Sequence, residues 1–203
     1  KKEKNVHENM KLEPLTDYSK FKAECENILN KYQSDDFTVV TIRPATVCGY
    51  SPRQRLDVVV NILTNLAYNK REITVLGGEQ LRPNIHIKDM VNAYKLILEM
   101  DKKYINGKIY NVGYQNHKVS EIAKFVKEVI GDDVKIINKE TDDHRSYHVS
   151  SQKILDELGF SPKYSIKEAI SDLKEAFENK LLLNSLNDDK YFNIRVMKKI
   201  NLK

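Results

Sequence analysis

The sequence predicts an α/β protein, because short apolar runs typical of strands alternate with longer segments of helical periodicity. The clearest strand is the run FTVVTI, residues 37–42, whose continuous β-branched composition indicates burial on both faces. The clearest helices carry apolar residues at spacings of three and four, as in residues 119–130. No G-x-G-x-x-G sequence follows a strand, so the phosphate-binding half expected of such an architecture is predicted to be missing from this chain.

The first fifty residues are expected to contain one helix and one strand. Residues 1–17 are predicted as a loop that ends in a helix cap at Thr16 or the residue after it. A helix over 18–33 follows, and then the strand over 37–42. Residues 45–53 contain glycine and proline and are predicted as a loop.

The same alternation continues along the rest of the chain. The expected strands cover 73–76, 84–87, 108–112 and 134–137, and the expected helices cover 55–69, 88–100, 119–130, 154–158 and 165–180. Ser165 and Glu168 form a capping box at the start of the last helix. Gly77-Gly78 is interpreted as a hairpin turn.

Composition excludes several classes of protein. Hydrophobic residues make up 40% of the chain, yet no apolar run approaches the roughly 20 residues needed to cross a bilayer. The two cysteines, Cys25 and Cys48, match no zinc or redox spacing and are expected to be reduced thiols in a cytoplasmic protein. The net charge is +5, but the basic residues are dispersed and only 8% of residues are aromatic, so no nucleic-acid partner is expected.

The balance of lysine and arginine points to anion binding. Only seven of the 34 basic residues are arginines. Where a lysine-rich chain uses arginine, a planar donor for phosphate or carboxylate is one reason for the choice. Chance is an adequate explanation for Arg71 and Arg195.

Tyr18 and Lys22 lie four residues apart at the start of the first predicted helix, so their side chains share one face. A lysine ammonium beside a phenol stabilises the phenolate, and such a tyrosine can exchange a proton with a hydroxyl group near neutral pH. The spacing alone is weak evidence, because it recurs by chance in lysine-rich helices. A metal site is not predicted, since His144 and His148 have no helical pattern or acidic ligand around them.

The order of the motifs makes the pattern specific. TDYSKFK (16–22) is followed by TIRPATVCGYSPR (41–53), GGEQLRPNIHIKDMVNAY (77–94), KIYNVG (108–113) and HRSYHVSSQKILDELGFSPK (144–163). This series resembles the extended short-chain dehydrogenase/reductase family of NAD-dependent nucleotide-sugar epimerases and dehydratases. The resemblance covers residues 13 to about 178.

The resemblance implies the carboxy-terminal part of an NAD(P)-binding Rossmann-like fold with a small mixed α/β substrate-binding lobe. Residues 1–50 would end the dinucleotide-binding domain, 51–180 would form mainly the nucleotide-sugar lobe with interleaved Rossmann elements, and 181–203 would be a tail. A glycine-rich half, and a Ser or Thr partner of the catalytic Tyr, would precede this chain.

The resemblance also implies roles for nine residues. Tyr18 is the expected catalytic acid/base. Lys22 is expected to lower the pKa of the Tyr18 phenol and to hold the nicotinamide ribose. The turn that lines the nicotinamide corresponds to Pro44, Ala45, Thr46 and Val47. The substrate diphosphate is expected to contact Asn61, Arg82 and Arg145. The sequence departs from the family pattern at positions expected to contact the substrate, as at Pro83-Asn84 after Arg82. The resemblance therefore does not imply which nucleotide and which sugar the substrate contains.

The resemblance therefore implies an epimerase or dehydratase that uses NAD rather than NADP and transfers hydride at the sugar, with C4 the expected position. A 4-dehydrogenase or ketoreductase of the same family is an alternative, and a non-catalytic binding protein of the same fold is another. The expected partners are a nucleotide-sugar and a second copy of the chain, with no membrane. The 203-residue chain alone is expected to be inactive and to bind NAD weakly, because it lacks the glycine-rich loop.

Overall fold

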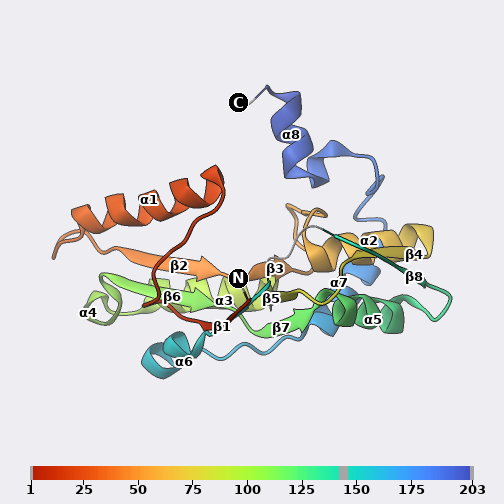
Figure 1. The fold of residues 1–203 in the computed structure, drawn as a ribbon. Coiled ribbons are helices and arrows are strands. Elements are labelled where there is room, and N and C mark those ends of the chain that lie inside the picture. Colours follow the sequence, from red (N-terminus) through yellow and green to blue (C-terminus); the bar gives the residue numbers. More distant parts are fainter. Residues whose placement is uncertain (1, 142–145, 202–203) are drawn as a thin grey trace.

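Strands and helices alternate along the chain in a computed structural model that describes residues 2–141 and 146–201 (Figure 1). The strands are β1 (Lys2–Val6), β2 (Val40–Pro44), β3 (Thr46–Cys48), β4 (Glu72–Leu76), β5 (Leu81–His86), β6 (Lys108–Val112), β7 (Gln115–Lys118), β8 (Lys135–Lys139) and β9 (Ser146–Val149). The helices are α1 (Asp17–Tyr32), α2 (Val59–Lys70), α3 (Ile87–Glu99), α4 (Lys102–Ile105), α5 (Val119–Ile130), α6 (Gln152–Leu158), α7 (Ile166–Glu178) and α8 (Asn193–Lys199), with a 3-10 turn η1 (Asp189–Tyr191). This arrangement confirms the predicted α/β class.

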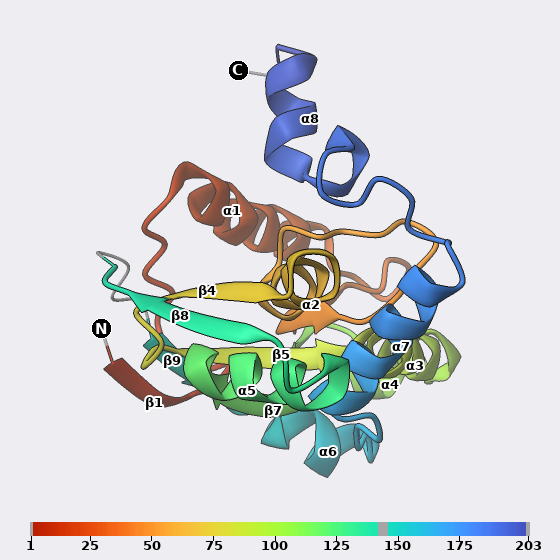
Figure 2. The same ribbon diagram turned by 90° about the vertical axis from the view of Figure 1, so that its right-hand side faces the viewer.

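Parallel pairing dominates the sheets. β2 pairs with β6 from Val40 opposite Lys108 to Pro44 opposite Val112. β3 runs parallel to β5, and β7 adds to β5 as an antiparallel neighbour. β4 pairs with β8 and β1 with β9, both in parallel (Figure 2). Such pairings require crossovers, which the helices supply.

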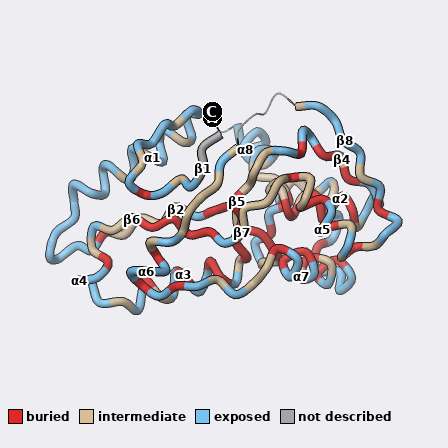
Figure 3. The backbone as a smooth tube through the Cα atoms, turned by 60° about the horizontal axis from the view of Figure 1, so that its bottom comes forward, coloured by how far each residue is buried: buried red, intermediate tan, exposed pale blue. Residues whose placement is uncertain are grey.

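Buried side chains gather in three clusters (Figure 3). The first packs α2, α5 and α7 together and includes Val60, Ile73, Ile122 and Ile170. The second lies between the strands β2, β5 and β6 and the helices α3 and α6, and includes Ile85, Tyr110, Val112 and Ile154. The third, around Leu56, Phe177 and Tyr191, ties the carboxyl-terminal residues to the loop before α2. Burial of this apolar surface stabilises the fold.

Helix α1 confirms the predicted helix but buries none of its residues. Thr16 and Ser19 form its capping box, with the Ser19 N–H donating to Thr16 Oγ1 at 3.2 Å. A two-pronged ion pair docks the helix on β2, because Arg43 Nη2 and Nε lie 2.6 and 3.0 Å from the Glu26 carboxylate. α1 is therefore held to the sheet by a charged contact rather than by a buried apolar face.

The strand predicted over 37–42 begins later, at Val40. Ser34 Oγ accepts the Phe37 N–H at 3.1 Å, and Asn106 Oδ1 accepts the Val39 N–H at 3.0 Å. These side-chain acceptors take backbone donors that a strand ladder would otherwise use, so the apolar run opens with a turn. The loop predicted over 45–53 in turn contains the short strand β3.

The interpretation of Gly77-Gly78 as a hairpin turn is wrong. β4 pairs with β8, whereas β5 pairs with β3 and β7, so the two glycines carry the chain from one sheet to another. Both have positive φ angles, +76° and +107°. A Cβ on Gly77 would lie 2.5 Å from the Thr141 methyl group, so this crossing requires glycine.

Candidate functional site

A cavity of about 490 Å³ lies where β2 and β3 end. All four residues of the predicted nicotinamide turn, 44–47, line this cavity. Asn61 of α2 also lines it, together with Arg53 and Arg55 from the loop between β3 and α2. The structure thus brings five of the nine predicted site residues to one place.

The turn is held by its neighbours on both sides. The Ala45 N–H donates to the Val112 carbonyl of β6 at 2.8 Å. Thr46 and Val47 pair with Asn84 and Ile85 of β5. This part of the cavity is consequently a fixed wall of small side chains and paired backbone.

Asn61 uses its amide to order the loop around the cavity. Its Oδ1 accepts the Gly49 N–H at 3.1 Å, and its Nδ2 donates to the Arg55 carbonyl at 2.8 Å. Gln54 reinforces the same loop by donating to the Gly49 and Arg55 carbonyls at 3.3 and 2.9 Å. Asn61 is 3% exposed, so its predicted contact with the substrate diphosphate stays a prediction.

Tyr18 and Lys22 lie together on the first turns of α1. Lys22 Nζ is 5.9 Å from the centre of the Tyr18 ring, as the four-residue spacing predicts. Neither side chain lines the cavity, and Tyr18 is 73% exposed. The amino-terminal end of α1 nevertheless lies above the carboxyl end of β2 (Figure 1), whose last residue, Pro44, lines the cavity.

The other two predicted diphosphate ligands do not join this group. Arg82 lies on β5 opposite His117, is half-buried, and donates from Nη1 to the Leu81 carbonyl at 3.0 Å. It is not part of the cavity wall. Arg145 and His144 fall outside the described residues.

Arg53 and Arg55 are the cationic residues that line the cavity. The resemblance assigned no role to them. Arg55 Nε pairs with Asp57 Oδ1 at 2.9 Å, and its side chain remains 44% exposed. A guanidinium held in this way offers further donors to an anion.

Cys48 lines the cavity but is not a reactive group. Burial raises the pKa of its thiol to about 12, and Sγ donates weakly to the Ile85 carbonyl at 3.4 Å. The thiolate, which is the nucleophilic form, is therefore scarce at neutral pH.

We expect a thiol reagent such as Ellman's reagent to titrate one thiol in the native 203-residue chain at pH 8. Cys25 is exposed and should react at once, whereas Cys48 should react only after unfolding. Raising the pH to 9 should not make Cys48 react with the reagent, because that pH is still well below the pKa of about 12 for its thiol. Two fast thiols at pH 8 would contradict the burial of Cys48, and Cys25→Ser identifies which one reacts.

His86 has a structural role at the start of α3. Its Nδ1 accepts the Lys88 N–H at 3.0 Å and caps α3. Its Nε2 lies 3.3 Å from Asp172 Oδ2 without hydrogen-bonding geometry, and burial is the main cause that lowers the pKa of the imidazole. The nearby Asp89 carboxylate accepts the Lys163 and Tyr164 N–H groups, at 3.0 and 2.8 Å, and so fixes the loop before α7.

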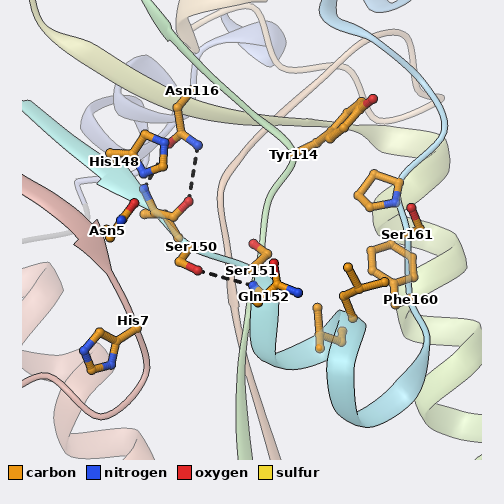
Figure 4. Close-up of a pocket in the computed structure, with 14 residues that line it drawn as sticks. Asn5, His7, Tyr114, Asn116, His148, Ser150, Ser151, Gln152, Phe160 and Ser161 are labelled. Atoms are coloured by element: carbon orange, nitrogen blue, oxygen red, sulfur yellow. Dashed lines mark hydrogen bonds between the residues drawn. The ribbon is translucent and has the colours of Figure 1, made fainter.

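A second cavity, of about 610 Å³, lies beside β9 and the start of α6 (Figure 4). Most of its polar groups are already paired. Asn116 exchanges two hydrogen bonds with the Val149 backbone, and Ser151 Oγ accepts the Gly113 N–H at 2.8 Å. His148 Nδ1 is buried without a hydrogen-bond partner. None of the eight predicted site residues that the structure describes lines this cavity.

Within residues 2–141 and 146–201, no cluster of three His, Cys, Asp or Glu side chains is arranged to hold a metal ion. No helix in these ranges is both long enough and apolar enough to span a membrane.

A sequence model of one protein family matches residues 1–113, and its description is "NAD dependent epimerase/dehydratase family". The chain belongs to this family. This membership confirms the resemblance drawn from the motif order. The turn at 44–47 and the pair Tyr18 and Lys22 lie within the matched residues, and their roles at the site stay predictions.

Curated relatives carry names of nucleotide-sugar enzymes. The uncharacterized UDP-glucose epimerase YtcB of Bacillus subtilis is 29% identical over 133 residues, which cover 64% of this chain and 41% of that protein. UDP-glucuronic acid decarboxylase 6 of Arabidopsis thaliana is 29% identical over 149 residues, covering 70% of this chain and 42% of that protein. The chain thus spans less than half the length of these relatives.

Solved structures confirm the fold. UDP-glucuronic acid 4-epimerase from Bacillus cereus, in complex with UDP-glucuronic acid and NAD, superposes with a TM-score of 0.75 at 22% identity. The match covers 87% of this chain and 57% of that one. UDP-glucose 4-epimerase from Thermotoga maritima, with UDP-glucose, gives 0.72 at 24% identity, covering 88% and 63%. The Rossmann-like architecture predicted from the sequence is therefore correct.

Proposed function

We propose that the full-length protein containing this chain is an NAD-dependent enzyme that epimerises the sugar of a nucleotide-sugar, with hydride transfer at C4. One observation carries the proposal. A single cavity is lined by both the small-residue turn 44–47 and the cations Arg53 and Arg55, and the amino-terminal end of α1, the helix that carries Tyr18 and Lys22, lies above the carboxyl end of β2. Redox chemistry and anion binding would thus lie side by side.

The wall formed by residues 44–47 fits a flat nicotinamide ring. It is made of small or β-branched side chains, and the backbone of residues 45–47 is paired with β5 and β6. These residues, with Lys22 at the ribose, would hold the nicotinamide end of NAD. When bound, NAD supplies a reversible hydride acceptor.

In this proposal, Tyr18 is the group that transfers the proton. In the proposed reaction its phenolate accepts the proton of the sugar hydroxyl that is oxidised, and the phenol returns it when that carbon is reduced. The Lys22 ammonium, on the same helix face, stabilises the phenolate that exists before the proton is accepted and after it is returned. Return of hydride to the opposite face of the sugar would give the epimer.

Binding of the nucleotide diphosphate would position the sugar. Arg53 and Arg55 offer guanidinium groups inside the cavity, and the resemblance adds Arg82, Arg145 and Asn61. Energy from these remote contacts would hold the reacting carbon in place. We also propose that residues 1–50 belong to the cofactor domain, that 51–180 form most of the nucleotide-sugar lobe, and that the protein is a homodimer.

The test uses the full-length protein, because the chain spans less than half of its curated relatives. The protein would be incubated with UDP-glucose, UDP-glucuronic acid and the GDP-, CDP- and dTDP-hexoses, with the sugar products separated by chromatography. Cofactor released by denaturation would be identified by its absorbance. One nucleotide-sugar converted to its C4 epimer, with NAD released, is the expected result.

Other outcomes would overturn the proposal. Loss of water from the sugar would indicate a dehydratase, and net oxidation or reduction would indicate a dehydrogenase or ketoreductase. No turnover and no NAD in the released material would indicate a non-catalytic member of the fold.

A further inference from the structure

The carboxyl-terminal segment lies against the loop that forms one rim of the cavity. We call residues 51–57 the rim loop and residues 188–193 the strap. In Figure 1 the chain leading to α8 lies above the loop that precedes α2, and Figure 2 shows the same arrangement from the side. The rim loop contains both arginines that line the cavity.

Two backbone donors tie the strap to the rim loop. The Leu56 N–H donates to the Tyr191 carbonyl at 2.9 Å. The Asn193 N–H donates to Asp57 Oδ2 at 3.0 Å, across 136 residues of sequence. The first contact is at the last residue of the 3-10 turn and the second is two residues beyond it, so the strap meets the loop at two points.

Apolar side chains also pack between the strap and the rim loop. Leu56 is 0% exposed and Tyr191 is 4% exposed, and both belong to a cluster with Phe177 and Leu182. The Tyr191 hydroxyl donates to the Leu183 carbonyl at 3.2 Å. A strap anchored in this way constrains the rim loop rather than merely lying on it.

The strap reaches each cavity arginine through one polar side chain. Asp57 accepts from Arg55 Nε at 2.9 Å with one oxygen while its other oxygen accepts the strap N–H. Asn193 Oδ1 accepts from Arg53 Nη2 at 3.3 Å. The Asp57 side chain is 17% exposed, whereas that of Arg55 is 44% exposed, so the guanidinium stays accessible while its partner is largely buried.

We propose that the strap positions Arg53 and Arg55 to bind the diphosphate of the nucleotide-sugar, with Asn193 and Asp57 as positioning residues. The inference rests on the proposed function of the same cavity. Long arginine side chains lose rotamer freedom when they bind an anion, and a partner that already holds them reduces that cost. The carboxyl-terminal segment therefore contributes to substrate affinity although it lines no part of the cavity.

The test compares three variants of the full-length protein. Asn193→Leu removes the acceptor for Arg53, and Asn193→Asp keeps an acceptor oxygen in the same place. Asn187→Leu is the matched control, because its amide donates to Asn184 at 3.3 Å and does not touch the rim loop. For each variant, kcat and KM for the nucleotide-sugar, the melting temperature, and the hydrogen exchange of peptides over residues 51–57 would be measured.

We expect Asn193→Leu to raise KM about tenfold with kcat within about twofold of the parent, and to speed exchange in the rim loop. Asn193→Asp should restore KM to within about threefold, and Asn187→Leu should change neither quantity. An unchanged KM in Asn193→Leu, or an equal rise in Asn187→Leu, would overturn the inference.

The exchange measurement separates this inference from the proposed function. If the parent protein binds no nucleotide-sugar, the proposed function fails, but rim-loop exchange still reports whether the strap holds the loop. Exchange in residues 51–57 that is the same in Asn193→Leu and the parent would show that it does not.

Discussion

Replacing Tyr18 by Phe in the full-length protein is expected to lower kcat by about 100- to 10,000-fold, the usual range for loss of a positioned acid or base. The phenyl ring keeps the shape of the side chain but cannot accept or return a proton. Because Tyr18 is 73% exposed on α1, the change should not disturb folding. The Kd for the nucleotide-sugar, measured by calorimetry, should therefore stay close to that of the parent.

Tyr32→Phe is the matched control for this variant. Tyr32 is on the same helix, is 66% exposed, and lies far from the amino-terminal turns that carry Tyr18 and Lys22. Its kcat should match that of the parent. Lys22→Met should lower kcat as well, since the phenolate would lose its cation. A Tyr18→Phe protein with most of its turnover would refute the assignment of Tyr18 as acid and base.

Helices α1–α3 and α5–α7 were predictable because their signals are local, whereas the short α4 and α8 were not predicted. α1, α5 and α7 show helical periodicity, and the capping boxes at Thr16 and Ser165 mark two of their starts. The strands β1, β7 and β9 were not predicted. They are short and largely polar, and β1 pairs with β9, a segment more than 130 residues away in the sequence. No local pattern reports such a pairing.

The site shows the same division between local and distant information. The motif order led to the turn at 44–47 and to Asn61, and the structure brings these residues to one cavity. It gave no role to Arg53, whose partner Asn193 is 140 residues away. The motif order also could not show that the Asn61 side-chain amide forms hydrogen bonds with the backbone of Gly49 and Arg55. Residue types suggest chemistry, but the partners of each polar group come only from the fold.

Asp89→Asn is expected to lower the free energy of unfolding by about 2–4 kcal/mol, the second large effect. Asp89 is 1% exposed and accepts the Lys163 N–H on both oxygens, each at 3.0 Å, and the Tyr164 N–H at 2.8 Å. An amide in its place would turn an NH₂ group toward one of these donors. A buried backbone N–H would then be left without an acceptor, and the loop that leads into α7 would lose its anchor on α3.

Urea unfolding followed by circular dichroism would measure this loss, with Asp156→Asn as the control. Asp156 is exposed on α6 and accepts only a side-chain hydrogen bond, from Gln152 at 2.8 Å, so its change should stay within about 0.5 kcal/mol. Equal stability of the two variants would mean that Asp89 does not hold residues 163 and 164. Such a result would also weaken the assignment of His86 to the fold, because His86 and Asp89 together begin α3 and brace it against the segment that leads into α7.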